Sequence, residues 1–196
     1  KDGGQRYRAE GDLRVTLEKV INALCYEADP SDGWHLIAMP FMSYVWVGEV
    51  DNLTANDYDL YYYDEPTHYW INHKDTLNNN QFVGLEKSKG YLYANSQAVT
   101  LDVTNWIEPG NAEVNIPLSY TDGIDLAGFN LVGNPFVHNV TGFTGNNVAT
   151  ECFRLNDTKN DLMVGTIDAD HPLLPVEGVF VKATGDNASV TLHGQT

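Results

Sequence analysis

The chain has 196 residues, of which 42% are hydrophobic and 19% are charged. This composition is typical of a globular protein and excludes a disordered one, and the length suits one large domain or two small ones. Eleven basic and 27 acidic residues give a net charge of −16. Such a surface repels phosphate backbones and anionic membranes, so we expect no nucleic-acid partner. No apolar stretch reaches the roughly 18 residues that span a bilayer. We therefore expect no membrane span. We also expect the protein to be a monomer.

The first residues do not resemble a folded element. Residues 1–12 are polar and glycine-rich, and the start at Lys1 is typical of a trimmed or processed fragment that carries no export signal. The segment from Leu13 to Tyr26 fits both a helical face and an alternating strand. Because everything downstream is strand-like, we predict a strand there. A turn follows at residues 29–33, where several helix- and strand-breaking residues stand together.

One nine-residue stretch occurs twice. It runs from Gly33 to Phe41 as GWHLIAMPF and from Gly128 to Phe136 as GFNLVGNPF. Glycine opens each copy and the apolar run closes on Pro-Phe, which is typical of a short buried strand bounded by turn residues. Short alternating runs with glycine and asparagine between them fill the rest of the chain, for example Val99, Leu101 and Val103. Many short strands of this kind predict an all-β sandwich or barrel.

The duplication continues beyond this stretch. The later matches are Asp59–Asp64 with Cys152–Asp157, Trp70 with Met163, Leu85 with Leu173, Gly90–Tyr93 with Gly178–Val181, and Val99–Leu101 with Val190–Leu192. Two copies are too few for a solenoid, which needs about three or more. We therefore predict an all-β fold of two sandwich-like (jelly-roll-like) units from an internal duplication, joined by a strand at Val114–Leu118. The expected segments are a tail and first strand or strands at 1–32, one repeat at 33–104, a connecting strand and turn at 105–127, and the second repeat at 128–196.

These motifs resemble a module found in secreted and surface proteins of Bacteroidetes. The residues that carry the resemblance are Gly33 to Phe41, Tyr58 to Asp64, Trp70, Lys89 to Asn95, Gly128 to Phe136 and Glu177 to Ala183. Lys89 stands where a glycine is usual, and His35 stands where asparagine or tyrosine is common. The resemblance implies an adhesin-like, extracellular all-β module at the outer-membrane surface or secreted. It implies no catalytic residues.

Catalytic signatures are missing from the sequence, which has no G-x-S-x-G, H-E-x-x-H, paired C-x-x-C, P-loop or G-x-G-x-x-G motif. We expect no cofactor. The acidic clusters at Asp168–His171 and Asn156–Asp161 are read as solvated turns and not as calcium sites, since neither has EF-hand spacing. Cys25 and Cys152 are read as two buried thiols, with a long-range disulfide as the alternative in an exported protein. A hydrolase with paired loop carboxylates stays open as the rival function, because carboxylate separation is a spatial property.

Aromatic residues crowd the first repeat and not the second. In the alignment above, Tyr61, Tyr63 and Trp70 of the first repeat become Arg154, Asn156 and Met163 of the second. A core position tolerates such changes poorly, so we expect these three rings to be at least partly exposed. Tyrosine and tryptophan offer rigid amphipathic surface that suits sugars and proteins. The sequence therefore predicts a ligand-binding platform for a glycan or a protein at Tyr61, Tyr63 and Trp70.

Overall fold

The computed structural model describes residues 13–23, 33–41, 44–75, 82–107, 112–156 and 161–195 of the chain. These residues form fifteen β-strands and one three-residue 3-10 helix, which confirms the all-β prediction. In the first half the elements are β1 (Leu13–Ile21), β2 (His35–Ala38), β3 (Val45–Trp46), η1 (Val47–Glu49), β4 (Tyr58–Asp64), β5 (Tyr69–Asn72), β6 (Gly84–Leu85), β7 (Gly90–Asn95) and β8 (Val99–Ile107). In the second half they are β9 (Glu113–Pro117), β10 (Phe129–Gly133), β11 (Val140–Asn146), β12 (Val148–Leu155), β13 (Leu162–Gly165), β14 (Gly178–Ala183) and β15 (Ser189–Gly194).

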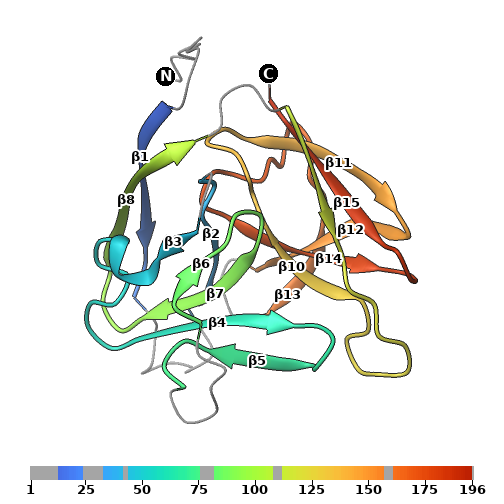
Figure 1. Ribbon diagram of the computed structural model, residues 1–196, viewed down its shortest axis with the longest axis horizontal. Coiled ribbons are helices and arrows are strands. Elements are labelled where there is room, and N and C mark those ends of the chain that lie inside the picture. Colours follow the sequence, from blue (N-terminus) through green and yellow to red (C-terminus); the bar gives the residue numbers. More distant parts are fainter. Residues whose placement is uncertain are drawn as a thin grey trace.

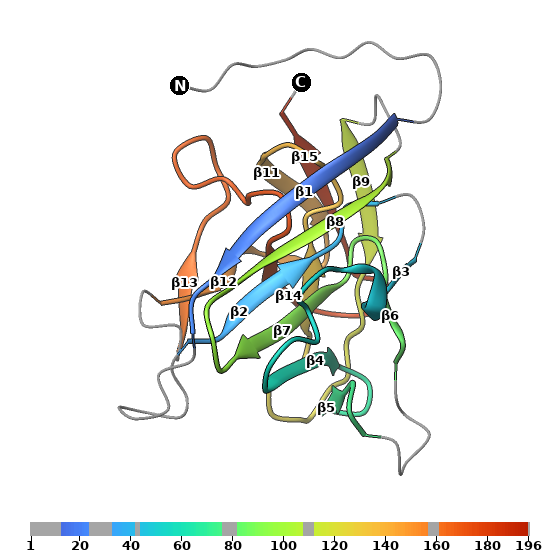
Figure 2. The same cartoon turned by 90° about the vertical axis from the view of Figure 1, so that its left-hand side faces the viewer.

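The strands form two sandwich-like units, which we call the first unit (β1–β8) and the second unit (β9–β15). Each unit has an inner four-stranded sheet, ordered β2-β7-β4-β5 in the first and β10-β14-β12-β13 in the second. The outer layer is the pair β1-β8 in the first unit and the sheet β11-β15-β9 in the second. Figure 1 shows the outer strands on the two sides of the molecule with the inner strands between them. Figure 2, turned onto the first unit, shows β2, β7, β4 and β5 in that order below β1 and β8.

The two inner sheets are paired in one common register. Leu36 lies opposite Leu92 in the first unit, and Leu131 lies opposite Phe180 at the same place in the second. The match holds for four consecutive residue pairs. In the first unit His35–Ala38 pair with Gly90–Tyr93, and in the second unit Asn130–Gly133 pair with Gly178–Val181. The two nine-residue copies therefore contain strands with the same partners.

The outer layers follow the same plan. Ile21 lies opposite Val99 in the β1-β8 pair, and Ile116 lies opposite Val190 in the β9-β15 pair. The strand expected to connect the units is thus β9, and its hydrogen bonds place it in the outer sheet of the second unit. We therefore count β1 with the first unit and β9 with the second.

Alternation along the inner strands separates three apolar clusters. Ile37 and Tyr91 point into a core between the two layers of the first unit, and Val132 and Val179 point into the corresponding core of the second. Residues one position along point the other way, because neighbouring side chains of a strand face opposite sides. These residues form a third cluster that joins the two inner sheets, with Leu36, Tyr63, Leu131 and Phe180 buried in it.

Backbone contacts between the units are reciprocal. The Ala38 amide donates to the Val176 carbonyl at 3.2 Å, and the Gly133 amide donates to the Ser88 carbonyl at 2.9 Å. Ala38 and Gly133 are equivalent positions in the two units, as their pairing shows. At Gly133 a Cβ atom would lie 2.4 Å from the Ala38 Cβ atom, so this close approach requires glycine. The units therefore pack about an approximate two-fold axis, as the subunits of a symmetric dimer do.

Candidate functional site: an aromatic hollow and an inter-unit cleft

Two exposed rings mark the edge of the inner sheet of the first unit. Strand β5 is bonded only to β4 in that sheet, and it carries Tyr69 and Trp70. Tyr69 is 69% exposed and Trp70 is 41% exposed. The expected exposure of Trp70 is therefore confirmed.

The Trp70 ring is held in place by two other rings. Tyr63 is its direct cross-strand partner on β4, with ring centroids 5.3 Å apart. Phe180 of the second unit meets the Trp70 ring edge to face at 6.1 Å. Contacts of this kind contribute about 0.5–1.5 kcal/mol beyond area burial. Trp70 thus offers a pre-oriented apolar surface to the solvent.

The expected exposure of Tyr63 is wrong. Its side chain is only 8% exposed, because it faces the cluster between the units and contacts Phe180 at 6.2 Å between ring centroids. Tyr61 is half-buried and lies 6.1 Å from the Trp34 ring, and neither ring borders the hollow beside Trp70. Of the three predicted platform residues, the structure therefore places only Trp70 at that hollow.

The cause is a one-residue slip in the sequence alignment of the repeats. Leu60 lies opposite Tyr93 in the first unit, and Cys152 lies opposite Val181, the equivalent of Tyr93, in the second. Leu60 is therefore equivalent to Cys152, whereas the sequence alignment matched it to Phe153. Because strand side chains alternate, a shift of one residue assigns each of them to the wrong face.

Corrected equivalences keep the apolar character of these positions. Tyr61 corresponds to Phe153, Tyr63 to Leu155 and Trp70 to Leu162, and not to Arg154, Asn156 and Met163. Phe153, Leu155 and Leu162 also pack into the cluster between the units. Burial between the units thus explains the large apolar residues Tyr63, Phe153, Leu155 and Leu162.

A hollow of about 530 Å³ lies beside the exposed rings, and we call it the aromatic hollow. Its lining combines rings with short polar side chains: Tyr62, Asp64, Thr67, Tyr69, Trp70, Ile71, Asn72 and Asp75. The Thr67 hydroxyl donates to the Asp64 carboxylate, and the Asn72 side-chain oxygen accepts the Lys74 amide at 2.8 Å. These contacts fix the carboxylate and the amide beside the rings. The hollow therefore presents both apolar faces and hydrogen-bonding groups.

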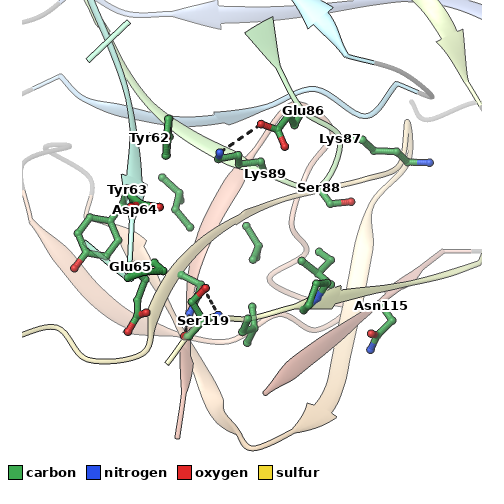
Figure 3. Close-up of a pocket in the computed structure, with 17 residues that line it drawn as sticks. Tyr62, Tyr63, Asp64, Glu65, Glu86, Lys87, Ser88, Lys89, Asn115 and Ser119 are labelled. Carbon is green, nitrogen blue, oxygen red and sulfur yellow. Dashed lines mark hydrogen bonds and ion pairs between the residues drawn. The ribbon is translucent and has the colours of Figure 1, made fainter. Parts of the chain in front are cut away.

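A second cavity of about 440 Å³, the inter-unit cleft, lies between β4, residues 86–89, β9 and β10 (Figure 3). On one side the Lys89 ammonium lies 3.7 Å from the centre of the Tyr62 ring and 3.5 Å from Glu86 Oε1. Burial, followed by the nearby charges of Asp64 and Glu86, raises the pKa of Tyr62 above its usual value. The phenol therefore stays neutral to a higher pH than a tyrosine at the usual value of 10.0.

Glu65 forms the base of the inter-unit cleft and ties the units together. It is 2% exposed, and one carboxylate oxygen accepts the amides of Thr121 at 2.7 Å and Gly128 at 2.9 Å. The other oxygen accepts the Thr121 hydroxyl at 3.0 Å. No sequence pattern indicates this role, since both partners lie more than 50 residues away along the chain. Three hydrogen bonds compensate the burial of the charge.

The approximate two-fold axis gives this cleft a counterpart, the mate cleft, with a volume of only about 120 Å³. Its lining includes Arg154, Leu155 and Glu177, the equivalents of Tyr62, Tyr63 and Lys89. The Lys19 ammonium of β1 lies 3.4 Å from Glu177 Oε1 in this cleft. One cleft is therefore crossed by an ion pair, while its counterpart stays open.

The acidic turn at Asp168 forms its own hydrogen bonds. The Asp168 carboxylate accepts the Thr166 hydroxyl at 2.8 Å and the His171 amide at 2.7 Å, and these bonds lower the pKa of Asp168. Asp157 and Asn160 lie outside the described residues. Within the described part of the chain, no group of three or more histidine, cysteine or acidic side chains could hold a metal ion.

The described thiol is buried. Cys152 is a free cysteine with no exposed surface, and burial raises the pKa of its thiol. The reading of Cys152 as a buried thiol is therefore confirmed, while Cys25 lies outside the described residues. A search of the described ranges for a helix long and apolar enough to cross a membrane finds none.

Comparison of the chain with protein-family models, with curated proteins and with solved structures gave no match.

Proposed function

We propose that the protein is a non-catalytic binding module of an exported surface protein, and that it holds a glycan at the aromatic hollow. The observation that carries this proposal is that Tyr69 and Trp70, on opposite faces of the edge strand β5, are both exposed and both line a hollow with polar groups on its rim. Apolar faces of sugar rings stack on tyrosine and tryptophan, and their hydroxyl groups need acceptors and donors nearby. Asp64, Asn72 and Thr67 are placed to meet that need.

Rigidity of the ring surface supports the same proposal. Binding loses free energy when side chains must be ordered, by about 0.5–1.5 kcal/mol for each mobile side chain. Tyr63 and Phe180 already order Trp70 before any ligand arrives. The hollow is therefore pre-organised for a ligand with a flat apolar face.

A glycan array followed by calorimetric titration of its hits tests the proposal. We expect Trp70→Ala and Tyr69→Ala each to weaken binding about tenfold, as the loss of one stacked ring of roughly 1.4 kcal/mol implies. Trp46→Ala is the matched control, since Trp46 is an exposed tryptophan on β3 outside the hollow. We expect this control to bind like the wild type.

Two results would count against the proposal. If both variants bind every hit as tightly as the wild type, the aromatic hollow is not the site. If no glycan binds, the module holds a protein partner or serves as a spacer, and pull-down with the Trp70→Ala variant distinguishes those two roles.

The rival function is hydrolysis of a polysaccharide by acids of the inter-unit cleft. It is favoured by one observation, that Asp64, Glu65 and Glu86 all line this cleft. Glu65 already accepts three hydrogen bonds and Glu86 is paired with Lys89, which argues against a free acid and base. Release of reducing ends from array hits, abolished by Glu86→Gln, would establish the rival.

A further inference from the structure

We infer that the aromatic hollow and the inter-unit cleft form one continuous path for an extended, uncharged glycan chain. This inference rests on the proposed function and names the class of ligand for the same site. It commits the ligand to a chain that crosses from one unit to the other, and not to a single terminal sugar.

Shared residues connect the two cavities. Tyr62 and Asp64 line both of them, and these two side chains lie on the same face of β4. The cavities measure about 530 and 440 Å³, so neither is a minor extension of the other. Beyond Tyr62 the path continues between the Glu86–Lys89 turn and β9, where Asn115 lies on the opposite side (Figure 3).

The mate cleft shows that the fold itself does not require an opening here. Both clefts are built from equivalent strands, yet the mate is about 120 Å³ and is crossed by the Lys19–Glu177 pair. The residues at the equivalent positions are Lys89, which lines the open cleft, and Val114, which packs against the core of the second unit, so that bridge cannot form there. Lys89 instead turns onto the Tyr62 ring and Glu86. The opening is therefore a property of these side chains and not of the duplicated scaffold.

Charge along the path selects a neutral ligand. Two ammonium groups, of Lys87 and Lys89, line the inter-unit cleft, and the Lys89 ammonium is paired with Glu86 and covers a ring. Three carboxylates, of Asp64, Glu65 and Glu86, line the same cleft, so its lining carries no excess of positive charge. The whole chain carries −16, which repels polyanions. The lining combines apolar groups such as Leu131 and Pro117 with polar groups such as Ser88 and Asn115. Combined apolar and hydrogen-bonding surface suits a chain of neutral sugars.

Calorimetric titration with oligosaccharide pairs tests the path. The probes are the disaccharides and hexasaccharides of cellulose, xylan, mannan and chitin, with a hexasaccharide of galacturonic acid as the polyanion. We expect the hexasaccharide of the binding series to bind about tenfold more tightly than its disaccharide, because additional sugars contact the inter-unit cleft. The polyanion should not bind.

Two variants at equivalent positions show whether the affinity gain of the hexasaccharide arises in the inter-unit cleft. Asn115→Trp puts a ring into the open cleft. Val20→Trp makes the same change at the equivalent exposed position of β1, because Val20 lies opposite a threonine of β8 as Asn115 lies opposite a threonine of β15. We expect Asn115→Trp to remove the gain of the hexasaccharide while leaving the disaccharide affinity unchanged. Val20→Trp should keep the full gain.

Each result has one meaning. Equal binding of the short and long probes, or an unchanged gain in Asn115→Trp, overturns the continuous path but leaves the glycan function at Trp70 standing. Tighter binding of the polyanion overturns the neutral ligand class. If none of the probes binds and the array is silent, the proposed function fails and this inference fails with it.

Discussion

The strands β7 and β14 occupy equivalent places in the two units but fill their cores differently. Tyr91 and Tyr93 of β7 are fully buried, and Val179 and Val181 of β14 stand at the same positions with no exposed surface either. Both pairs point into the core of their own unit. The first unit therefore holds two phenol rings where the second holds two small aliphatic groups.

The hydroxyl groups of the two tyrosines explain the difference. Tyr93 donates to the Leu53 carbonyl at 2.8 Å, and the Tyr91 oxygen accepts the Glu86 amide at 2.7 Å. Asn95 adds a bond to the Ala55 carbonyl at 2.8 Å. All three bonds hold backbone groups of irregular segments, which cannot be left unpaired when buried.

The second unit satisfies the same need with a strand. There β11 runs for seven residues and pairs with β15 along six of them. The corresponding stretch of the first unit consists of η1, turns and a single bridge between Asp51 and Asp102. Side-chain hydroxyl and amide groups thus replace a sheet pairing. Duplicated scaffolds can diverge in this way as long as each buried backbone group keeps a partner.

The largest expected effect comes from giving the first unit the residue of the second. Tyr93→Val leaves a cavity the size of most of a ring and removes the acceptor and donor that serve Asn95 and Leu53. We expect the free energy of unfolding to fall by about 4 kcal/mol in denaturant titration. Tyr93→Phe separates the two causes and should lose only about 1–2 kcal/mol.

The reciprocal change tests whether the two cores are really different in shape. Val181→Tyr inserts a ring into a core that is already filled, and we expect a loss of about 1–3 kcal/mol. If Val181→Tyr is neutral, the second unit has room for a ring. The contrast between the two cores would then rest on sequence drift and not on packing.

An effect smaller than that of Tyr93→Val is expected at the tie between the units. Glu65→Ala leaves the Thr121 and Gly128 amides without their acceptor, and we expect a loss of about 3 kcal/mol in the free energy of unfolding. Glu65→Gln keeps one carbonyl oxygen and should lose about half as much. Thr67→Ala, on the same turn, is the control. A loss in the control as large as in Glu65→Ala would assign the effect to the turn and not to the tie.

Much of this architecture could be predicted from the sequence. The repeated glycines of the nine-residue stretch are needed for conformation, since Gly33 and Gly128 both have positive φ angles, of 85° and 76°. Apolar alternation identified the strands because it reports directly which face is buried. The expectation that Leu13 begins a strand is confirmed for the same reason.

The candidate site could be predicted only in part. The alignment of β4 with β12 is set by hydrogen bonds to β7 and β14, whereas the sequence alignment matched Asp64 to Asp157 and was therefore shifted by one residue. The inter-unit cleft depends on residues from strands far apart in sequence, among them Lys89 and Asn115. Only Lys89 carried a signal, as a departure from the glycine usual at its position. Trp70 was predicted from its mismatch with Met163, although its structural equivalent is Leu162, and its exposed neighbour Tyr69 was missed.

Alkaline pH should act on the first unit through its buried tyrosine Tyr91. Burial raises the pKa of Tyr91 above its usual value of 10.0, while the unfolded chain ionises near that value. The stabilising contribution of the neutral phenol is therefore complete below pH 10 and is lost as the pH rises further. Tyr91→Phe should lose about 1–2 kcal/mol at neutral pH, because the Glu86 amide loses its acceptor, and this deficit should shrink above pH 10. Unfolding measured by circular dichroism from pH 7 to pH 11 checks both parts. A deficit that stays constant over this range would contradict the role of Tyr91 ionisation.

The smallest effect is expected where one cleft is closed. Lys19→Val copies into β1 the residue at the equivalent position of β9, Val114, and removes the Lys19–Glu177 ion pair of the mate cleft, both side chains of which are partly exposed. Partly exposed pairs contribute less than about 1 kcal/mol, so the free energy of unfolding should change little. The mate cleft should open at the same time, which a crystal structure of the variant can measure. Because Glu177 also accepts the Leu174 amide at 3.1 Å, it should keep its position when Lys19 is removed. A loss of several kcal/mol would mean that the scaffold requires the bridge. Other contacts would then have to stabilise the inter-unit cleft in place of such a bridge. The residues Val114 and Lys89 alone would not explain why that cleft is open.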